Sequence, residues 1–266
     1  APVEKAVAAL IASWPGENSA WGHNWAWLLL SSLGLLRGLG LVASNGDLTI
    51  DAVDGTGKPL TAVLRPRPDA SENLKELVRH TTPLEGFAKT FDRGNFVAQP
   101  LSDSGAFYVS IDDMSDLDGY TFETLTKEVL DTIARPKVSR IVIDLRRNGG
   151  GDNYFGEPLR RELARSRLNR PGGIYVLTAP QTFSAAQNLA NRLERETFAT
   201  FVGEPTGSAP NMHGDPELFT GTVSGVTAMV STLRWYDGGP HDRRGWIFPD
   251  LFVPNRFADW AAGTDR

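Results

Sequence analysis

The distribution of apolar residues divides the chain into two parts. Near the N-terminus, apolar residues recur with helical spacing over 3–13 and 20–37, and they alternate over 48–53 and 60–64 around a turn beginning at Asp54. From residue 106 onward, short apolar runs alternate with amphipathic segments. This pattern predicts a small α+β subdomain over 1–100 and a larger α/β core over 101–266.

The larger part is organised as repeated strand-helix units. Strands are predicted at 106–111, 140–145, 173–178 and 199–203, and helices at 121–134, 154–165 and 184–195. Such alternation predicts a parallel sheet with right-handed crossovers. A further helix is predicted at 71–80 and further β structure near 226–231, whereas residues 93–104 show no clear period.

Composition narrows the function classes. The 266 residues are 41% hydrophobic and 22% charged, which is typical of a globular protein and excludes disorder or fibre. A net charge of −5 provides no broad basic surface, so nucleic-acid binding is disfavoured. The absence of cysteine excludes thiol nucleophiles, disulfides and thiolate metal sites, and it leaves the cellular compartment open.

The sequence also lacks the patterns typical of membrane-spanning, nucleotide-binding and metal-binding proteins. Residues 25–42 are apolar and 18 residues long but contain Arg37, which costs about 2.5–3.5 kcal/mol at the centre of a membrane helix, so we predict a buried helix and no membrane span. Neither nucleotide-binding glycine motif fits, and no H-E-x-x-H spacing occurs. We therefore expect no cofactor and no metal.

Two loops carry candidate chemistry because each follows a buried strand and opens a helix. The first contains Gly149, Gly150 and Gly151, whose backbone N–H groups a ligand can approach without hindrance from a Cβ atom. The second places Ser184 at the start of a helix, where the helix dipole favours negative charge. Each loop alone has an ordinary structural explanation: a tight turn for the glycines, and an N-cap for the serine.

The pair of loops is more informative than either loop alone. Loops that leave consecutive parallel strands emerge at the same edge of the sheet. The glycine amides and the Ser184 hydroxyl are thus expected to face each other across one crevice. A nucleophile beside oxyanion donors is the arrangement used for acyl transfer.

Four sequence blocks then resemble the C-terminal processing, or tail-specific, serine peptidases and their tricorn-core relatives. They are VIDLRRNGGGDN (142–153), YVLTAPQTFSAAQNLANRL (175–193), FVGEPTG (201–207) and IFPD (247–250). The resemblance implies a ClpP/crotonase-like core acting on a peptide or protein substrate. It also implies Ser184 as nucleophile, with an oxyanion hole formed by Ala185 and the glycine loop, Gly149 and Gly150.

The chain departs from this family at the general base. The Ser-Lys branch carries lysine in the block that here reads GEPTGSAP, where Ala209 occupies the lysine position, and no lysine follows Lys137. A Ser-Lys mechanism through that position is excluded. The tricorn-like branch uses an N-terminal histidine motif and an acidic residue after the serine, and this chain has no such histidine motif.

Histidines are the remaining candidates for the base. His213, in a turn after the GEPTG block, is the first candidate, with Asp242 or Glu204 orienting it. His23 and His80 belong to the N-terminal part and are expected to be ordinary surface residues. Candidates for substrate binding are Arg146, Asn148, Asn211 and His241.

Three functions remain open. The first is a serine peptidase. The second is a ligand-binding protein that has lost catalysis, and the third is an acyl-thioester enzyme of the crotonase type. The oligomeric state does not follow from the sequence.

Overall fold

The computed structural model describes residues 2–13, 16–43, 47–54, 56–65, 96–101, 104–117, 119–256, 258–259 and 262. The chain divides into two compact units. One comprises Ala1–Gly16, Gly22–Asp92 and Pro254–Arg266, and the other comprises Glu17–Trp21 and Arg93–Val253. The larger unit therefore includes a five-residue segment from near the N-terminus. The predicted helix at 71–80 lies outside the described residues.

The smaller unit contains helices and one hairpin. Its elements are α1 (Val3–Ser13), most of α2 (Ser19–Leu29), α3 (Leu33–Gly38), β1 (Leu48–Val53) and β2 (Pro59–Leu64). The hairpin β1–β2 confirms the alternating pattern. The helix expected over 20–37 is divided into α2 and α3, and between them Ser31 Oγ donates a hydrogen bond to Leu28 O at 2.7 Å. No helix in the described ranges is long and apolar enough to cross a membrane.

The larger unit is built on a six-stranded mixed sheet, with strands in the order β10-β7-β6-β5-β4-β3. The strands are β3 (Phe96–Leu101), β4 (Ala106–Ile111), β5 (Arg140–Asp144), β6 (Ile174–Thr178), β7 (Thr200–Gly203) and β10 (Leu251–Phe252). Strands β4 to β7 pair in parallel, as the strand-helix alternation predicts. Strand β3, which the sequence pattern missed, pairs antiparallel with β4.

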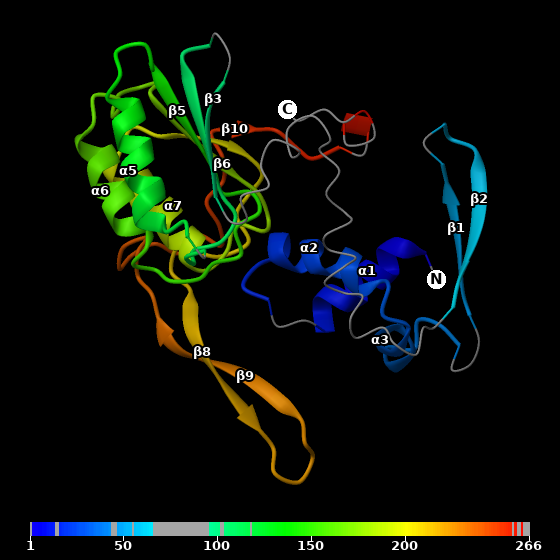
Figure 1. Ribbon diagram of the computed structural model, residues 1–266. Coiled ribbons are helices and arrows are strands. Elements are labelled where there is room, and N and C mark those ends of the chain that lie inside the picture. Colours follow the sequence, from blue (N-terminus) through cyan, green and yellow to red (C-terminus); the bar gives the residue numbers. More distant parts are fainter. Residues whose placement is uncertain are drawn as a thin grey trace. The chain divides into compact units, whose positions relative to one another are not determined.

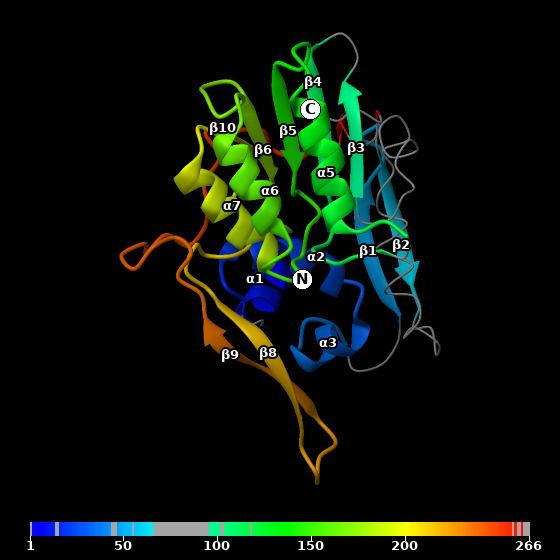
Figure 2. The ribbon, with the colours of Figure 1, turned by 60° about the vertical axis from the view of Figure 1, so that its left-hand side comes forward.

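Three helices, α5 (Phe122–Ile133), α6 (Gly156–Arg165) and α7 (Ala185–Glu196), lie side by side on one face of this sheet (Figure 2). The central strands are buried because helices cover them, and their side chains form a core with Leu159, Leu163, Leu189 and Leu193 of the helices. The N-cap Thr121 accepts a hydrogen bond from Thr124 N, which starts α5. The fold is a mixed α/β fold.

A long hairpin extends from this unit. Strands β8 (His213–Thr220) and β9 (Thr227–Arg234) pair only with each other, and they project away from the six-stranded sheet (Figure 1). The structure places His213 at the first position of β8, whereas the sequence predicted a turn there.

Candidate active site

The two candidate loops leave neighbouring parallel strands, β5 and β6, and are bonded to each other. Phe183 N donates to Asn148 O at 3.0 Å. Thr182 Oγ1 donates to Leu145 O at 2.8 Å, and Thr182 is fully buried. These bonds fix the serine loop against the glycine loop at one edge of the sheet.

Ser184 has a strained backbone at the start of α7. Its φ of 54° and ψ of −124° lie in a region that residues with a Cβ rarely adopt, at a cost of about 1–3 kcal/mol. The side chain makes no capping hydrogen bond to α7, all of whose residues are described. The ordinary N-cap explanation for this serine therefore does not hold, because its hydroxyl is not used to satisfy the helix.

Gly150 lies directly against Ser184. A Cβ atom at position 150 would come within 2.6 Å of Ser184 Cβ, 3.0 Å of Ser184 Oγ and 3.3 Å of Ala185 N. Its φ of +121° also requires glycine. The structure thus brings together the serine, the glycine loop and the first amide of α7. Gly149, in contrast, is exposed and has no heavy atom within 4 Å of its Cβ position.

Asn148 shapes this loop from within. It is fully buried, its Nδ2 donates to Ile111 O at 2.9 Å, and its Oδ1 accepts from Gly150 N at 2.9 Å. Its side chain is therefore engaged in building the loop, and its expected contact with substrate stays a prediction. Gly150 N–H is therefore occupied, whereas no acceptor within the described residues is found for the N–H groups of Ala185, Gly149 and Gly151.

The GEPTG block supports the serine loop from the other side. Ser208 Oγ accepts a hydrogen bond from Ser184 N at 3.2 Å, and Gly207 N donates to Thr182 O at 3.0 Å. Thr206 and Ser208 are fully buried. Glu204, at the start of the block, donates its N–H to Thr178 O at the end of β6. The block therefore holds Ser184 in its strained conformation.

A segment near the N-terminus completes the same region, and sequence reasoning did not find it. The indole of Trp21 stacks on the ring of Phe183, with ring centroids 3.9 Å apart. Asn18 Nδ2 donates to Thr206 O (3.0 Å) and to Gly245 O (2.7 Å), and its Oδ1 accepts from Trp21 N. The residue beside the nucleophile is thus covered by a tryptophan from the first tenth of the chain. No periodic signal in the sequence links these positions.

None of the histidines that the structure describes bonds to Ser184 Oγ. His213 is exposed, and its backbone N–H donates to Glu17 Oε1 at 3.4 Å. His241 is also exposed and belongs to the larger unit, whereas His23 is exposed in the part of α2 assigned to the smaller unit. His80 lies outside the described residues.

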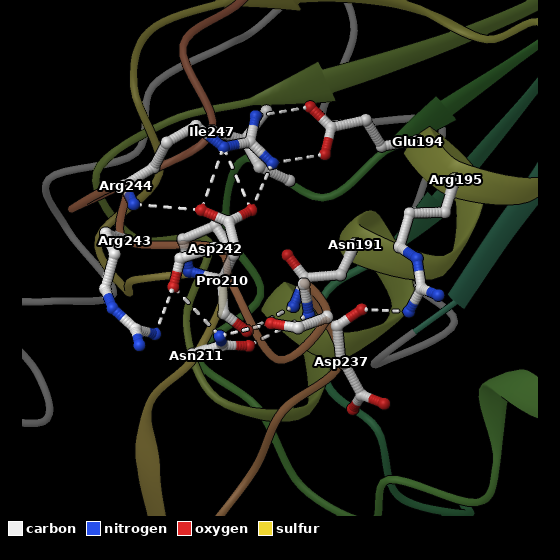
Figure 3. Close-up of polar contacts among 12 residues, drawn as sticks. Asn191, Glu194, Arg195, Pro210, Asn211, Asp237, Asp242, Arg243, Arg244 and Ile247 are labelled. Carbon is white, nitrogen blue, oxygen red and sulfur yellow. Dashed lines mark hydrogen bonds and ion pairs between the residues drawn. The ribbon is translucent and has the colours of Figure 1, made fainter.

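Asp242 is bound to arginine (Figure 3). Arg244 donates from Nη2 to Asp242 Oδ2 at 2.7 Å and also pairs with Glu194 at 2.7 Å. The hydrogen bonds from Arg244 hold the pKa of Asp242 below its usual range. Arg244 therefore links the carboxylates of Asp242 and Glu194, and the expected role of Asp242 in orienting His213 stays a prediction.

Asn211 braces the same loop. Its Nδ2 donates to Gly239 O (2.6 Å) and Asp242 O (3.0 Å), and its Oδ1 accepts from Gly238 N (Figure 3). Both polar atoms of its side chain are thus bonded within the chain, and its expected contact with substrate stays a prediction.

Arg146, which follows β5, is paired within the chain. Its guanidinium pairs with the buried Asp144 at 2.7 Å, and Tyr108 Oη donates to the same carboxylate at 2.7 Å. Burial and the negative charge of Asp144 raise the pKa of Tyr108 above its usual range. The guanidinium that we expected to bind a substrate carboxylate is therefore paired with Asp144.

No cluster of metal-binding side chains occurs among the residues described.

No protein-family model matches the chain. The fold is shared with solved peptidases at low sequence identity. Mature CPAF in complex with lactacystin matches at a TM-score of 0.61 and 14% identity, over 99% of this chain and 73% of that one. The photosystem II D1 C-terminal processing protease matches at a TM-score of 0.44 and 14% identity, over 84% of this chain. This chain spans 60% of that protease's length. Together with the mixed sheet, the match to mature CPAF shows a mixed α/β fold that this chain shares with that protein.

Proposed function

We propose that this protein is a serine hydrolase that cleaves peptides or protein tails through an acyl-enzyme at Ser184. The observation that carries the proposal is the conformation of Ser184. The residue is strained, its hydroxyl does not cap α7, and Gly150 leaves clear the space beside Oγ. Strain of this kind concentrates at functional sites, where the surrounding structure maintains it.

The reaction follows from the groups around the serine. Ser184 Oγ attacks the substrate carbonyl, and its proton passes to a base, which later gives it to the departing amine. Water then hydrolyses the ester and regenerates the hydroxyl. The N–H groups of Ala185 and Gly149 stabilise the negative oxygen of the tetrahedral intermediate. Gly150 keeps the site open and contributes no donor, since its N–H is bonded to Asn148.

His213 is our proposed base. It belongs to the same unit as Ser184 and follows Ser208, which binds Ser184 N, by five residues. The acidic residue proposed to orient it is Glu204, because Asp242 is engaged by Arg244. The contact between His213 and Ser184 would form when substrate binds, since catalytic hydrogen bonds often tighten only then.

The experiment is labelling with a fluorophosphonate probe, which reacts with activated serines. We expect wild type to be labelled and Ser184→Ala to be unlabelled, with Ser110→Ala, a buried serine of β4, as a control. His213→Gln is expected to slow labelling by about 10²–10⁴-fold, the usual contribution of a general base. Parallel variants His241→Gln and His23→Gln test the other exposed histidines.

A second function is favoured by one observation: in the described part of the chain, no base contacts Ser184 Oγ. A scaffold with this geometry and no base would bind a peptide or apolar ligand without cleaving it. Wild type that stays unlabelled from mildly acidic to basic pH, while remaining folded, would reject the hydrolase and favour this alternative.

A further inference from the structure

The hairpin β8–β9 exposes almost its entire surface. Every residue of β9 and all of β8 except Gly214 is exposed. Both views show the hairpin extending away from the six-stranded sheet of its unit (Figures 1 and 2). Isolated two-stranded hairpins are only marginally stable in water, and three or more strands with an apolar face are needed for independent stability.

The exposed surface is unusually apolar for a hairpin in water. Seven large apolar side chains of the strands and their turn are 49–100% exposed: Leu218, Phe219, Val223, Val226, Met229, Val230 and Leu233. These side chains lie on both faces of the hairpin and around its turn, and exposed apolar surface of this kind is typical of an interaction site.

The two faces of the hairpin differ in charge. The cross-strand pairs Leu218–Met229 and Pro216–Ser231 lie on the same face as the pair Thr220–Thr227. These six residues carry no charge. The opposite face carries Glu217 beside Val230.

The two edges also differ. At the turn, Gly221 N donates to Val226 O at 2.9 Å. Because hydrogen-bonded pairs alternate in antiparallel ladders, the backbone N–H groups of Thr227, Met229 and Ser231 point outward from β9. On the outward edge of β8, Pro216 has no N–H, and Asp215 interrupts the strand with a φ of 50°. Proline and irregular backbone protect a strand edge from further pairing. Only the β9 edge of this hairpin is open.

We propose that β9 pairs antiparallel with β9 of a second copy of this chain, which makes a four-stranded sheet across a two-fold axis. Residues 227–233 contain no charge, proline or glycine, so the strand can oppose itself without like-charge repulsion. The two Arg234 side chains would lie at opposite ends of the shared edge. At 3.4 Å per residue, an axis at Ser231 or Val230 separates these positions by roughly 20–27 Å, which is beyond the Debye length of about 8 Å.

The absence of charge along the open edge of β9 favours a second copy of this chain over a charged partner. An acidic or basic partner would find no opposite charge along the open edge, whereas a second β9 matches it in length, composition and hydrogen-bonding pattern. A two-fold axis perpendicular to the sheet also joins the two uncharged faces into one surface. The inference rests on the hairpin and is independent of catalysis at Ser184.

The first test is the mass of the full chain by light scattering after gel filtration. We expect a dimer of twice 29.0 kDa. Ser231→Pro removes an outward N–H from β9 without removing apolar surface, and it should weaken dimerisation roughly tenfold or more, because each copy loses an interstrand hydrogen bond. The matched control is Leu218→Pro, which removes an outward N–H from β8 and should leave the dimer intact.

Cysteine cross-linking supplies a second test that does not depend on proline being tolerated. The chain has no cysteine, so a single introduced residue can form only an intermolecular disulfide. Val230→Cys or Ser231→Cys should yield a covalent dimer on oxidation, and Leu218→Cys should not. A wild-type monomer at the highest soluble concentration, or a dimer unaffected by Ser231→Pro, would overturn the proposal. A monomer that binds an extended peptide along β9 would instead assign that edge to substrate.

Discussion

Replacing Gly150 by alanine tests the geometry on which the proposed site depends. The added methyl group would lie 2.6 Å from Ser184 Cβ, well inside van der Waals contact, and its nearest neighbours include backbone that cannot rotate away. The backbone φ of +121° adds strain for any residue with a Cβ atom. Either the glycine loop or Ser184 must therefore move.

The magnitude can be worked from these two effects. An unfavourable backbone conformation costs about 1–3 kcal/mol, and overpacking typically costs about 1–3 kcal/mol. We expect Gly150→Ala to lower the free energy of unfolding by about 2–6 kcal/mol, or roughly 4–24 °C in Tm for a domain of this size. A displacement of Ser184 by about 1 Å should also slow fluorophosphonate labelling by about 10²-fold.

Gly149→Ala is the matched control. Its Cβ would meet no heavy atom within 4 Å, and its backbone is not in the left-handed region. We expect this variant to change stability by less than about 1 kcal/mol, since a Gly→Ala change at an unstrained position is mildly stabilising. Denaturant unfolding and probe labelling, measured on both variants, check the prediction. A Gly150→Ala protein with wild-type stability and labelling rate would refute the proposed contact between glycine loop and nucleophile.

Two further predictions concern the surroundings of the site. Asn18→Ala removes three hydrogen bonds, two of them to Thr206 O and Gly245 O, and should lower the free energy of unfolding by about 2–3 kcal/mol. Asn24→Ala, at an exposed position, is the control. Equal melting temperatures for the two variants would contradict the hydrogen bonds of Asn18. Asp242 has a lowered pKa in the folded chain, so its contribution to stability is present above its unfolded pKa and is lost as pH falls through the folded value. Asp242→Asn should therefore reduce the acid dependence of stability, and an unchanged pH profile would count against the Arg244 pairing.

The strands β4 to β7 and the helices between them could be predicted because these strands are short, largely apolar runs, which are visible in the sequence. Strand β3 was missed because it lies at the sheet edge. Only Phe96 and Val97 are buried there, and Pro100 interrupts the apolar pattern. Local periodicity reports burial, so an edge strand with one proline leaves little signal.

The sequence by itself determined which segments form the central sheet and which two loops share its edge, because chain order and the rule for parallel strands decide both. Only the tertiary structure decided how individual polar groups are used. Asn148, Asn211 and Asp242 are bonded within the chain, and Trp21 lies on Phe183 across 162 positions of sequence. Such pairings depend on which side chains the packed chain brings within hydrogen-bond or van der Waals range, and the spacing of residues along the chain carries no record of that.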